Sequence, residues 1–214
     1  MLKLPAVVVN FKTYKNSTGA NAIKLAKALD FPNTAIVAQT ADIGWLSCET
    51  NLPLLAQHID NAEQGQSTGY VTAESVREEG AIGTLLNHSE HKLSFKVLRK
   101  SIEKAHKAGL FVVACAATPA EAKKIAKLKP DVIAIEPPEL IGGKISISTA
   151  KPEIITRTTK AIRNIPILCG AGVHNAEDVR IALKLGAKGV LVASAVCLAK
   201  NPRKVLSELL KGLR

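Results

Sequence analysis

Short apolar runs rich in β-branched residues alternate with longer amphipathic stretches from one end of the chain to the other. Near-continuous apolar runs are typical of parallel strands buried on both faces of a sheet. The pattern predicts eight such strands, at residues 6–10, 35–39, 54–59, 83–87, 110–115, 132–136, 166–170 and 189–193.

The stretches between these runs carry residues that are typical of the starts of helices. Thr118 followed by Pro119 is typical of a helix N-cap with proline at the first helical position, and Asn201 followed by Pro202 repeats the pattern. Strand–helix alternation repeated eight times predicts an α/β protein, a closed (β/α)8 barrel, with an open doubly wound sheet as the alternative. No linker-like segment interrupts the alternation, so we expect one domain over residues 1–214.

Composition narrows the classes of function. Hydrophobic residues make up 47% of the 214 positions and aromatic residues only 3%. A stacking platform for single-stranded nucleic acid needs exposed aromatic rings, and this chain is poor in them. The net charge of +11 comes from lysines and arginines scattered through the helical stretches. We therefore expect solvated helix faces and no nucleic-acid partner, with nucleic-acid binding or scaffolding as the alternative.

The four cysteines stand far apart, without a CxxC pair or a histidine at metal-ligand spacing. This distribution predicts reduced cysteines, a cytoplasmic setting and no metal site. The amino-terminal residues lack the apolar region of a signal peptide, and no apolar run is long enough to span a bilayer. We therefore expect no membrane partner.

Polar residues whose side chains can take part in a reaction end several of the apolar runs. Asn10 and Lys12 end the first run, His88 follows the fourth, and Glu136 ends the sixth. In a barrel, the carboxyl ends of all strands surround one mouth, where function gathers. A carboxylate can take a proton from a carbon beside a carbonyl, an imidazole can polarise that carbonyl, and an ammonium can stabilise the resulting enediolate.

Small residues end the last two runs, at residues 170–172 and 193–194. Such turns leave backbone N–H groups available for a phosphate, which barrel enzymes often bind after their seventh and eighth strands. The Gly170-Ala171-Gly172 segment lacks the third glycine of a dinucleotide fingerprint and lies late in the chain. The pattern therefore favours a phosphorylated small molecule and no dinucleotide cofactor.

Five motifs in one order resemble those of the triosephosphate isomerase family. They span nearly the whole chain: Asn10-Phe11-Lys12, Asn87-His88-Ser89-Glu90, Ile135-Glu136-Pro137-Pro138, Cys169-Gly170-Ala171-Gly172 and Val192-Ala193-Ser194. The short chain and the segment from Glu136 to Gly143 are similar to the compact archaeal branch of that family.

The resemblance implies a TIM barrel that interconverts dihydroxyacetone phosphate and D-glyceraldehyde 3-phosphate through an enediolate, in glycolysis and gluconeogenesis, without a cofactor. It implies that Glu136 is the catalytic base and His88 the electrophile. A glutamate beside a neutral histidine is the established pattern for this family. Lys12 then binds the substrate and stabilises the enediolate beside Asn10, and Glu90 organises the lysine.

The resemblance also implies a phosphate-binding site and a closing lid. Residues 137–144 correspond to the closing lid, which excludes water from the enediolate. Backbone groups of five residues are expected to bind the phosphate: Ile141, Gly142, Gly172, Ala193 and Ser194. Because His88 leads directly into Ser89 and Glu90, we also expect a first helical turn there.

The sequence differs from the family's usual pattern at two places, and one of its loops has a counterpart in the family. The lid has Pro138-Glu139-Leu140 where the better-known branch has a tryptophan, and His91-Lys92 stands where the family usually has an arginine, so an ion pair there is expected to be weaker. Residues 60–70 form a polar loop. In the family, the equivalent of Thr68 inserts into a neighbouring subunit, which implies a homo-oligomer, either a dimer or a tetramer.

Another phosphate-binding barrel, such as a synthase of tryptophan or thiamine biosynthesis, is the alternative enzyme. Such a synthase needs a different set of residues at the strand ends, and it does not account for Lys12, His88 and Glu136 together.

Overall fold

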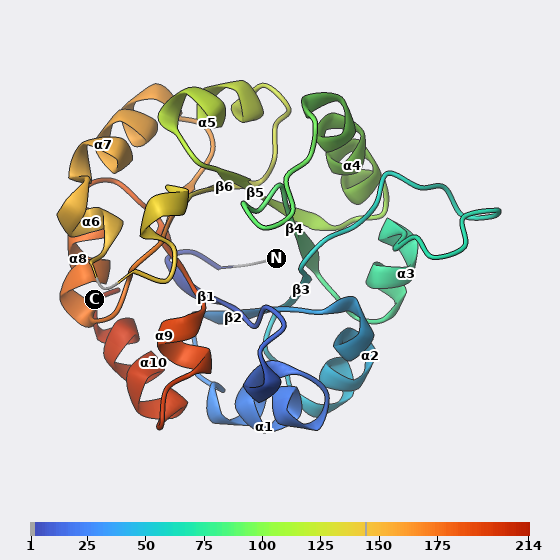
Figure 1. Cartoon of the computed structure of the whole chain (residues 1–214), viewed down its shortest axis with the longest axis horizontal. Helices are drawn as coiled ribbons and strands as arrows, with labels where there is room; N and C mark the ends of the chain where they lie inside the picture. Colours follow the sequence, from blue (N-terminus) through green and yellow to red (C-terminus); the bar gives the residue numbers. More distant parts are fainter. Residues whose placement is uncertain (1–2, 144) are drawn as a thin grey trace.

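The computed structural model describes residues 3–143 and 145–214. Within them, the strands form a closed parallel barrel in chain order (Figure 1). The barrel closes where the last strand, β8, pairs with the first, β1. The strands are β1 Ala6–Asn10, β2 Thr34–Ala38, β3 Leu54–Ala56, β4 Gly83–Leu86, β5 Phe111–Ala116, β6 Val132–Ile135, β7 Ile167–Gly170 and β8 Gly189–Val192. The expected (β/α)8 barrel is confirmed, and the alternative of an open sheet is wrong.

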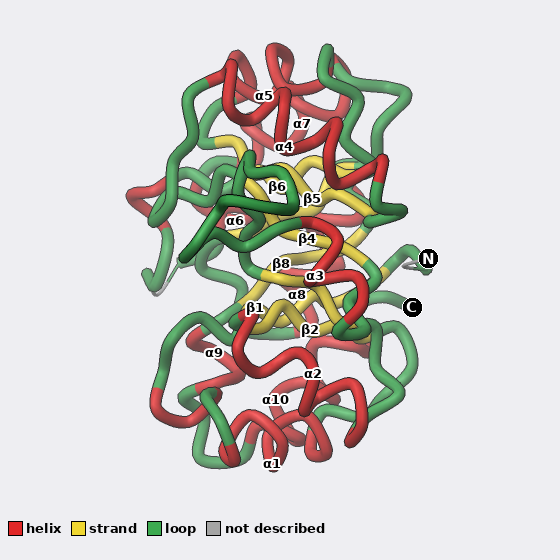
Figure 2. Tube along the Cα trace, turned by 90° about the vertical axis from the view of Figure 1, so that its right-hand side faces the viewer, coloured by secondary structure: helices red, strands yellow, loops and turns green. Residues whose placement is uncertain are grey.

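Helices lie between successive strands and surround the barrel, as Figure 2 shows in side view. They are η1 Lys15–Ser17, α1 Ala20–Ala28, α2 Thr40–Glu49, α3 Ala73–Glu78, α4 Phe95–Lys107, α5 Pro119–Ala126, η2 Pro138–Leu140, α6 Ile147–Ala150, α7 Pro152–Ala161, α8 Ala176–Lys184, α9 Ser194–Cys197 and α10 Pro202–Lys211. In the described ranges, none of them has the length and hydrophobicity that a membrane span requires.

Local sequence signals fix the ends of several helices. The side chain of Thr118 accepts a hydrogen bond from the N–H of Glu121 at the start of α5, and Asn201 accepts one from Lys204 at the start of α10. Both caps were predicted from the sequence. The strand predictions were accurate to within a residue or two, except that β3 ends at Ala56, three residues before the predicted end.

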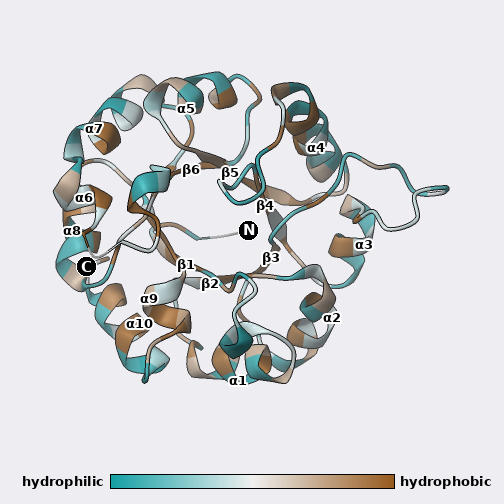
Figure 3. Ribbon diagram, viewed as in Figure 1, coloured by the Kyte–Doolittle hydropathy of each residue, from teal (hydrophilic) through white to brown (hydrophobic). Residues whose placement is uncertain are grey.

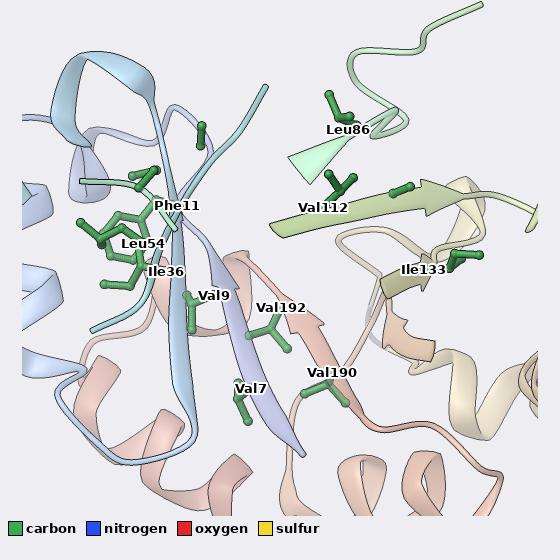
Figure 4. Close-up of a cluster of buried hydrophobic side chains, with 14 of the residues drawn as sticks. Val7, Val9, Phe11, Ile36, Leu54, Leu86, Val112, Ile133, Val190 and Val192 are labelled. Atoms are coloured by element: carbon green, nitrogen blue, oxygen red, sulfur yellow. The ribbon is translucent and has the colours of Figure 1, made fainter. Parts of the chain in front are cut away.

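The core has two layers because successive side chains of a strand point to opposite sides. One set, which includes Val7, Val9 and Phe11, packs between the barrel and the helices (Figure 4). The helices present their apolar faces to this layer and their polar faces outward (Figure 3). The other set, which includes Val8 and Leu168, fills the inside of the barrel.

The rows of side chains that face the inside of the barrel end in two of the candidate site residues. Ala6 and Val8 belong to the inner cluster, as does Ala134 of β6. Continuing each alternation by two residues brings Asn10 and Glu136 to the carboxyl ends of the same rows. The interior packing of the barrel therefore fixes the direction of these two side chains.

The loop between β3 and α3 extends outward beyond the ring of helices (Figure 1). Its neck is closed by Asp60, whose backbone N–H donates to the carbonyl of Val71 and whose carboxylate accepts from the N–H of Val71, each at 2.8 Å. An ion pair between Glu63 and Lys104 ties the loop to α4. The predicted loop at residues 60–70 is confirmed.

Candidate active site

One pocket at the carboxyl-terminal mouth of the barrel, with about 500 Å³ of empty space, is lined by all nine residues that the sequence predicted for the site. The nine are Asn10, Lys12, His88, Glu136, Ile141, Gly142, Gly172, Ala193 and Ser194. In Figure 1, the segments that follow β4 and β6 reach inward toward this mouth. The fold therefore brings together groups that lie up to 184 positions apart, from Asn10 to Ser194.

Glu136 is buried at the end of β6, with 7% of its surface exposed. Its Oε2 has no hydrogen-bond partner within the described residues. The neighbouring strand accommodates it because residue 170 is glycine: a β-carbon there would lie 2.4 Å from Cγ of Glu136. A buried carboxylate oxygen without a partner is expensive to desolvate, which is typical of a functional group.

Burial raises the pKa of Glu136 above its ordinary value. The neighbouring His88, Cys115 and Lys12 act in the opposite direction, and burial outweighs them. A carboxylate whose charged form is less solvated is a stronger base than an exposed glutamate.

His88 faces Glu136 across the pocket, with 3.7 Å between its Nε2 and Oε2 of the carboxylate. The other ring nitrogen, Nδ1, accepts a hydrogen bond of 3.2 Å from the backbone N–H of Glu90. A backbone N–H can only donate, so Nδ1 carries no proton. The neutral imidazole therefore has its proton on Nε2, which points into the pocket as a hydrogen-bond donor.

The chain around His88 is a turn and not the expected first turn of a helix. The N–H of His91 donates to the carbonyl of His88 at 2.8 Å. Asn87, at φ = +61°, accepts the N–H of Leu93 on its side-chain oxygen. The helix α4 begins only after Ser94, whose side chain caps it. The expectation of a helical turn at 88–90 is wrong because the Asn87 side chain holds a loop there.

Lys12 has a left-handed backbone, with φ = +47°, which is unfavourable for a residue other than glycine. Two hydrogen bonds hold it: Oδ1 of Asn10 accepts its N–H at 3.0 Å, and Nε2 of Gln57 donates to its carbonyl at 2.9 Å. Its ammonium lies 2.6 Å from Oε1 of Glu90. Asn10, Gln57 and Glu90 together thus aim the lysine at the pocket.

Lys92 lies where the sequence differs from the family, which usually has an arginine there. Its ammonium lies 2.5 Å from Oε1 of Glu121. The same carboxylate accepts hydrogen bonds from the Asn87 side chain and from the N–H of Ala117. An ion pair is therefore retained, and it braces the Asn87 turn that positions His88.

The expected lid follows β6 and includes η2. Its last residue in the sequence-based assignment, Lys144, lies outside the described residues. Beyond it, the chain packs directly on Gly172, which has φ = +67° and where a β-carbon would lie 2.2 Å from the carbonyl oxygen of Ile145. Gly172 therefore needs to be glycine for its conformation and for this close approach.

Ala193 and Ser194 mark the start of the short helix α9. The first helical hydrogen bonds run to the carbonyl of Ala193, from the N–H groups of Val196 and Cys197. The N–H groups of Ser194 and Ala195 precede these bonds, as the first amides of any helix do, and both residues line the pocket. They are therefore available to an anion in the pocket.

Sequence reasoning missed other residues that line the pocket. Tyr14 and His174 are among them. Nothing in the local sequence of His174 distinguishes it from a solvated surface histidine. Tyr14 lies only two residues after Lys12, a spacing that was available as a signal. In the described chain, no cluster of three or more His, Cys, Asp or Glu side chains is suited to hold a metal ion.

The fold and the pocket define a (β/α)8 barrel with an acid–base site at its carboxyl-terminal mouth. The sequence model described as triosephosphate isomerase matches residues 5–210. The chain belongs to the triosephosphate isomerase family.

Individual relatives support the membership of this chain in the family. The chain is 44% identical to a triosephosphate isomerase of Methanobacterium bryantii, over 98% of this chain and 97% of that protein. It is 42% identical to one of Methanothermus fervidus, over 96% and 97%. A crystal structure of triosephosphate isomerase from Bartonella henselae superposes with a TM-score of 0.70 at 18% identity, covering 97% of this chain and 96% of that one, and supports the fold.

Proposed function

We propose that this chain interconverts dihydroxyacetone phosphate and D-glyceraldehyde 3-phosphate, as a single catalytic domain acting in glycolysis and gluconeogenesis. The observation that carries the proposal is the 3.7 Å separation of two buried groups, Nε2 of His88 and Oε2 of Glu136, in one pocket. A base and a hydrogen-bond donor at this spacing can act on adjacent atoms of one small substrate.

Glu136 takes the proton from the carbon next to the carbonyl. The electron pair of the broken C–H bond forms the carbon–carbon double bond of the enediolate, and the carbonyl oxygen takes up the negative charge. The protonated glutamate then returns the proton to the neighbouring carbon, which completes the isomerisation. The raised pKa of the Glu136 carboxyl matches both halves of this exchange, because the group must accept and release one proton.

His88 and Lys12 stabilise the charge that develops on oxygen. The Nε2–H of His88 donates to the substrate oxygen and shuttles a proton between the two adjacent oxygens of the enediolate. The Lys12 ammonium, with its side chain only 12% exposed, supplies a positive charge that is weakly screened by water. No cofactor enters these steps.

The phosphate binds on backbone amides at the other end of the pocket. Those of Gly172 and Ser194 are proposed to hold it from the wall, and those of Ile141 and Gly142 from the lid. Ala193 contributes by starting α9 at this point. Fixing the phosphate orients the reacting carbons between Glu136 and the imidazole.

A coupled assay on glyceraldehyde 3-phosphate tests the activity. We expect turnover of glyceraldehyde 3-phosphate by the folded wild-type protein without added metal or cofactor. A correctly folded barrel that gives no turnover contradicts the proposal. Turnover of a tryptophan or thiamine precursor in its place would favour the alternative barrel enzyme.

We also propose that the chain forms a homo-oligomer in the cytoplasm. The loop that contains Thr68 extends away from the barrel, and Tyr70 beside it is 62% exposed. A second hollow next to Lys12, lined in part by Gln57 and Glu90, is proposed to receive this loop from a neighbouring subunit. The four cysteines are free, as expected in a reducing compartment.

Light scattering tests the assembly. We expect a dimer or a tetramer for the wild type and dissociation of Thr68→Arg, which adds bulk and charge to the loop. Asn164→Arg adds the same side chain at an exposed position near the amino end of β7 and serves as the control. A monomeric wild type, or equal behaviour of the two variants, contradicts the role of the loop.

A further inference from the structure

A histidine from outside the lid contacts the carboxyl end of the lid at the pocket wall. His174 lies in the turn between β7 and α8, and its Nε2 is 2.8 Å from the carbonyl oxygen of Gly143. A carbonyl can only accept, so Nε2–H is the donor. Both residues line the pocket. The contact therefore joins the lid to the wall at the edge of the site.

A buried carboxylate fixes both sides of this contact. Asp178, in the first turn of α8, is 8% exposed. Its Oδ2 accepts the backbone N–H of His174 at 2.9 Å, and its Oδ1 accepts the hydroxyl of Ser146 at 2.7 Å. Ser146 lies just beyond the lid, so one carboxylate holds both the histidine and the segment from which the lid extends.

The segment after the lid has further attachments to the same wall. The N–H of Ile147 donates to the carbonyl of Ala171 at 3.2 Å, and the hydroxyl of Ser148 donates to the carbonyl of Asp178 at 3.1 Å. With Gly172 in direct contact with Ile145, this end of the lid is firmly fixed. The lid itself is attached by fewer contacts: His174 to Gly143, an ion pair of 2.5 Å between Glu139 and Lys151, and the packing of Leu140 against the core.

We propose that His174 is a positioning residue that keeps the lid closed over the pocket by donating Nε2–H to the carbonyl of Gly143. The proposal rests on the proposed isomerase activity, because closure matters only if the lid covers the reacting substrate. His174 acts through the lid and not on the reacting atoms. The Asp178 carboxylate orients the turn that carries it, and the neighbouring Gly142 is thereby presented to the phosphate.

The place of the contact determines which kinetic constant responds. A hydrogen bond that holds the lid favours the substrate complex and the transition state equally, because neither the proton nor the oxygens being transferred touch it. Losing an interaction of this kind raises KM and leaves kcat unchanged. Losing a group that acts on the enediolate, such as His88, lowers kcat.

His174→Phe tests the proposal because phenylalanine retains a ring and removes the donor, at an exposed position where the fold tolerates the change. We expect KM for glyceraldehyde 3-phosphate to rise about fivefold, with kcat within a factor of two. His174→Gln retains an N–H donor and is expected to reverse at least half of the rise in KM. His106→Phe makes the same change at an α4 histidine that pairs with Asp131, and is the matched control.

Hydrogen exchange of the amides of residues 140–143 gives a second readout that needs no activity. We expect about fivefold faster exchange in His174→Phe and wild-type exchange in His106→Phe. A His174→Phe protein with unchanged KM and unchanged exchange overturns the proposal, as does a loss confined to kcat or a glutamine variant no better than the phenylalanine one. A wild type that turns over no triose phosphate refutes the proposed function, and lid exchange then still decides whether His174 holds the lid.

Discussion

Gly170 and Glu136 lie so close together on neighbouring strands that a single methyl group on the glycine would come within 2.4 Å of the glutamate Cγ and 2.5 Å of its Oε1. Both positions end inner rows of the barrel, side by side on the paired strands β6 and β7. The absence of a side chain at residue 170 is thus part of how the Glu136 carboxylate is positioned.

Gly170→Ala is therefore expected to displace the carboxylate while the barrel stays folded. A displacement of about 1 Å of a catalytic group lowers the rate by about 100-fold, and we expect a loss of that size in kcat/KM. Steady-state kinetics with a thermal melt check the prediction. Full activity of a folded Gly170→Ala protein would show that the position of Glu136 tolerates the added methyl group.

Glu136→Asp shortens the base by one methylene. We expect kcat to fall by about 100- to 1,000-fold with KM changed only a few-fold, because the carboxylate no longer reaches the carbon while the phosphate contacts remain. Kinetics of the purified variant measure both constants. Unchanged turnover would remove Glu136 from the role of base.

The raised pKa of Glu136 is expected to set the acid limit of activity. The base must be deprotonated, so kcat/KM falls as the pH decreases through the pKa of this group. Because burial raises that pKa, the acid limb is expected above pH 4.5, the ordinary value for a glutamate. A pH profile of kcat/KM measures it, over a range in which circular dichroism shows the barrel intact. An acid limb at or below the ordinary value contradicts the assignment.

Lys12→Ala removes the positive charge of the pocket wall, and Glu90→Gln removes only its 2.6 Å ion-pair partner. We expect Lys12→Ala to lower kcat/KM by about 1,000-fold and to raise KM, and Glu90→Gln to lower kcat/KM by about tenfold. The glutamine retains the backbone N–H that bonds Nδ1 of His88, so the imidazole stays oriented. Equal effects of the two substitutions would show that Glu90 does more than hold the lysine.

Much of this site was predictable because its residues end apolar runs. Asn10 and Glu136 continue an alternation that the barrel interior imposes, so their direction follows from the sequence once the fold is known. The place of the turns at 170–172 and 193–194 beside the pocket was predictable for a related reason, since small residues at strand ends leave backbone exposed.

Other features depend on contacts between distant segments. The strained backbone of Lys12 is held by Gln57, which is 45 residues away, and no local pattern predicts it. The turn at His88 depends on Asn87 reaching Leu93, where the local sequence favoured a helix. His174 meets the lid only because Asp178 orders the turn around it. Each of these requires tertiary structure that periodicity and caps do not specify.

His58 gives the chain a further pH dependence, this time in stability. Its ring stacks on that of His91 with 4.1 Å between centroids, beside Asp60. Burial lowers the pKa of His58 below its ordinary value of 6.5, the positive charge of His91 lowers it further, and the hydrogen bond to Asp60 only partly opposes them.

In the unfolded chain, His58 binds a proton near pH 6.5, whereas in the folded chain it does so only at lower pH. The unfolded state therefore binds more protons in this window, and the free energy of unfolding falls as the pH decreases from 6.5 through the folded pKa. His58→Phe retains a stacking ring and cannot be protonated. We expect its Tm to fall less between pH 7 and pH 5 than that of the wild type. Parallel curves for wild type and His58→Phe would show that the stacked pair does not contribute to acid sensitivity.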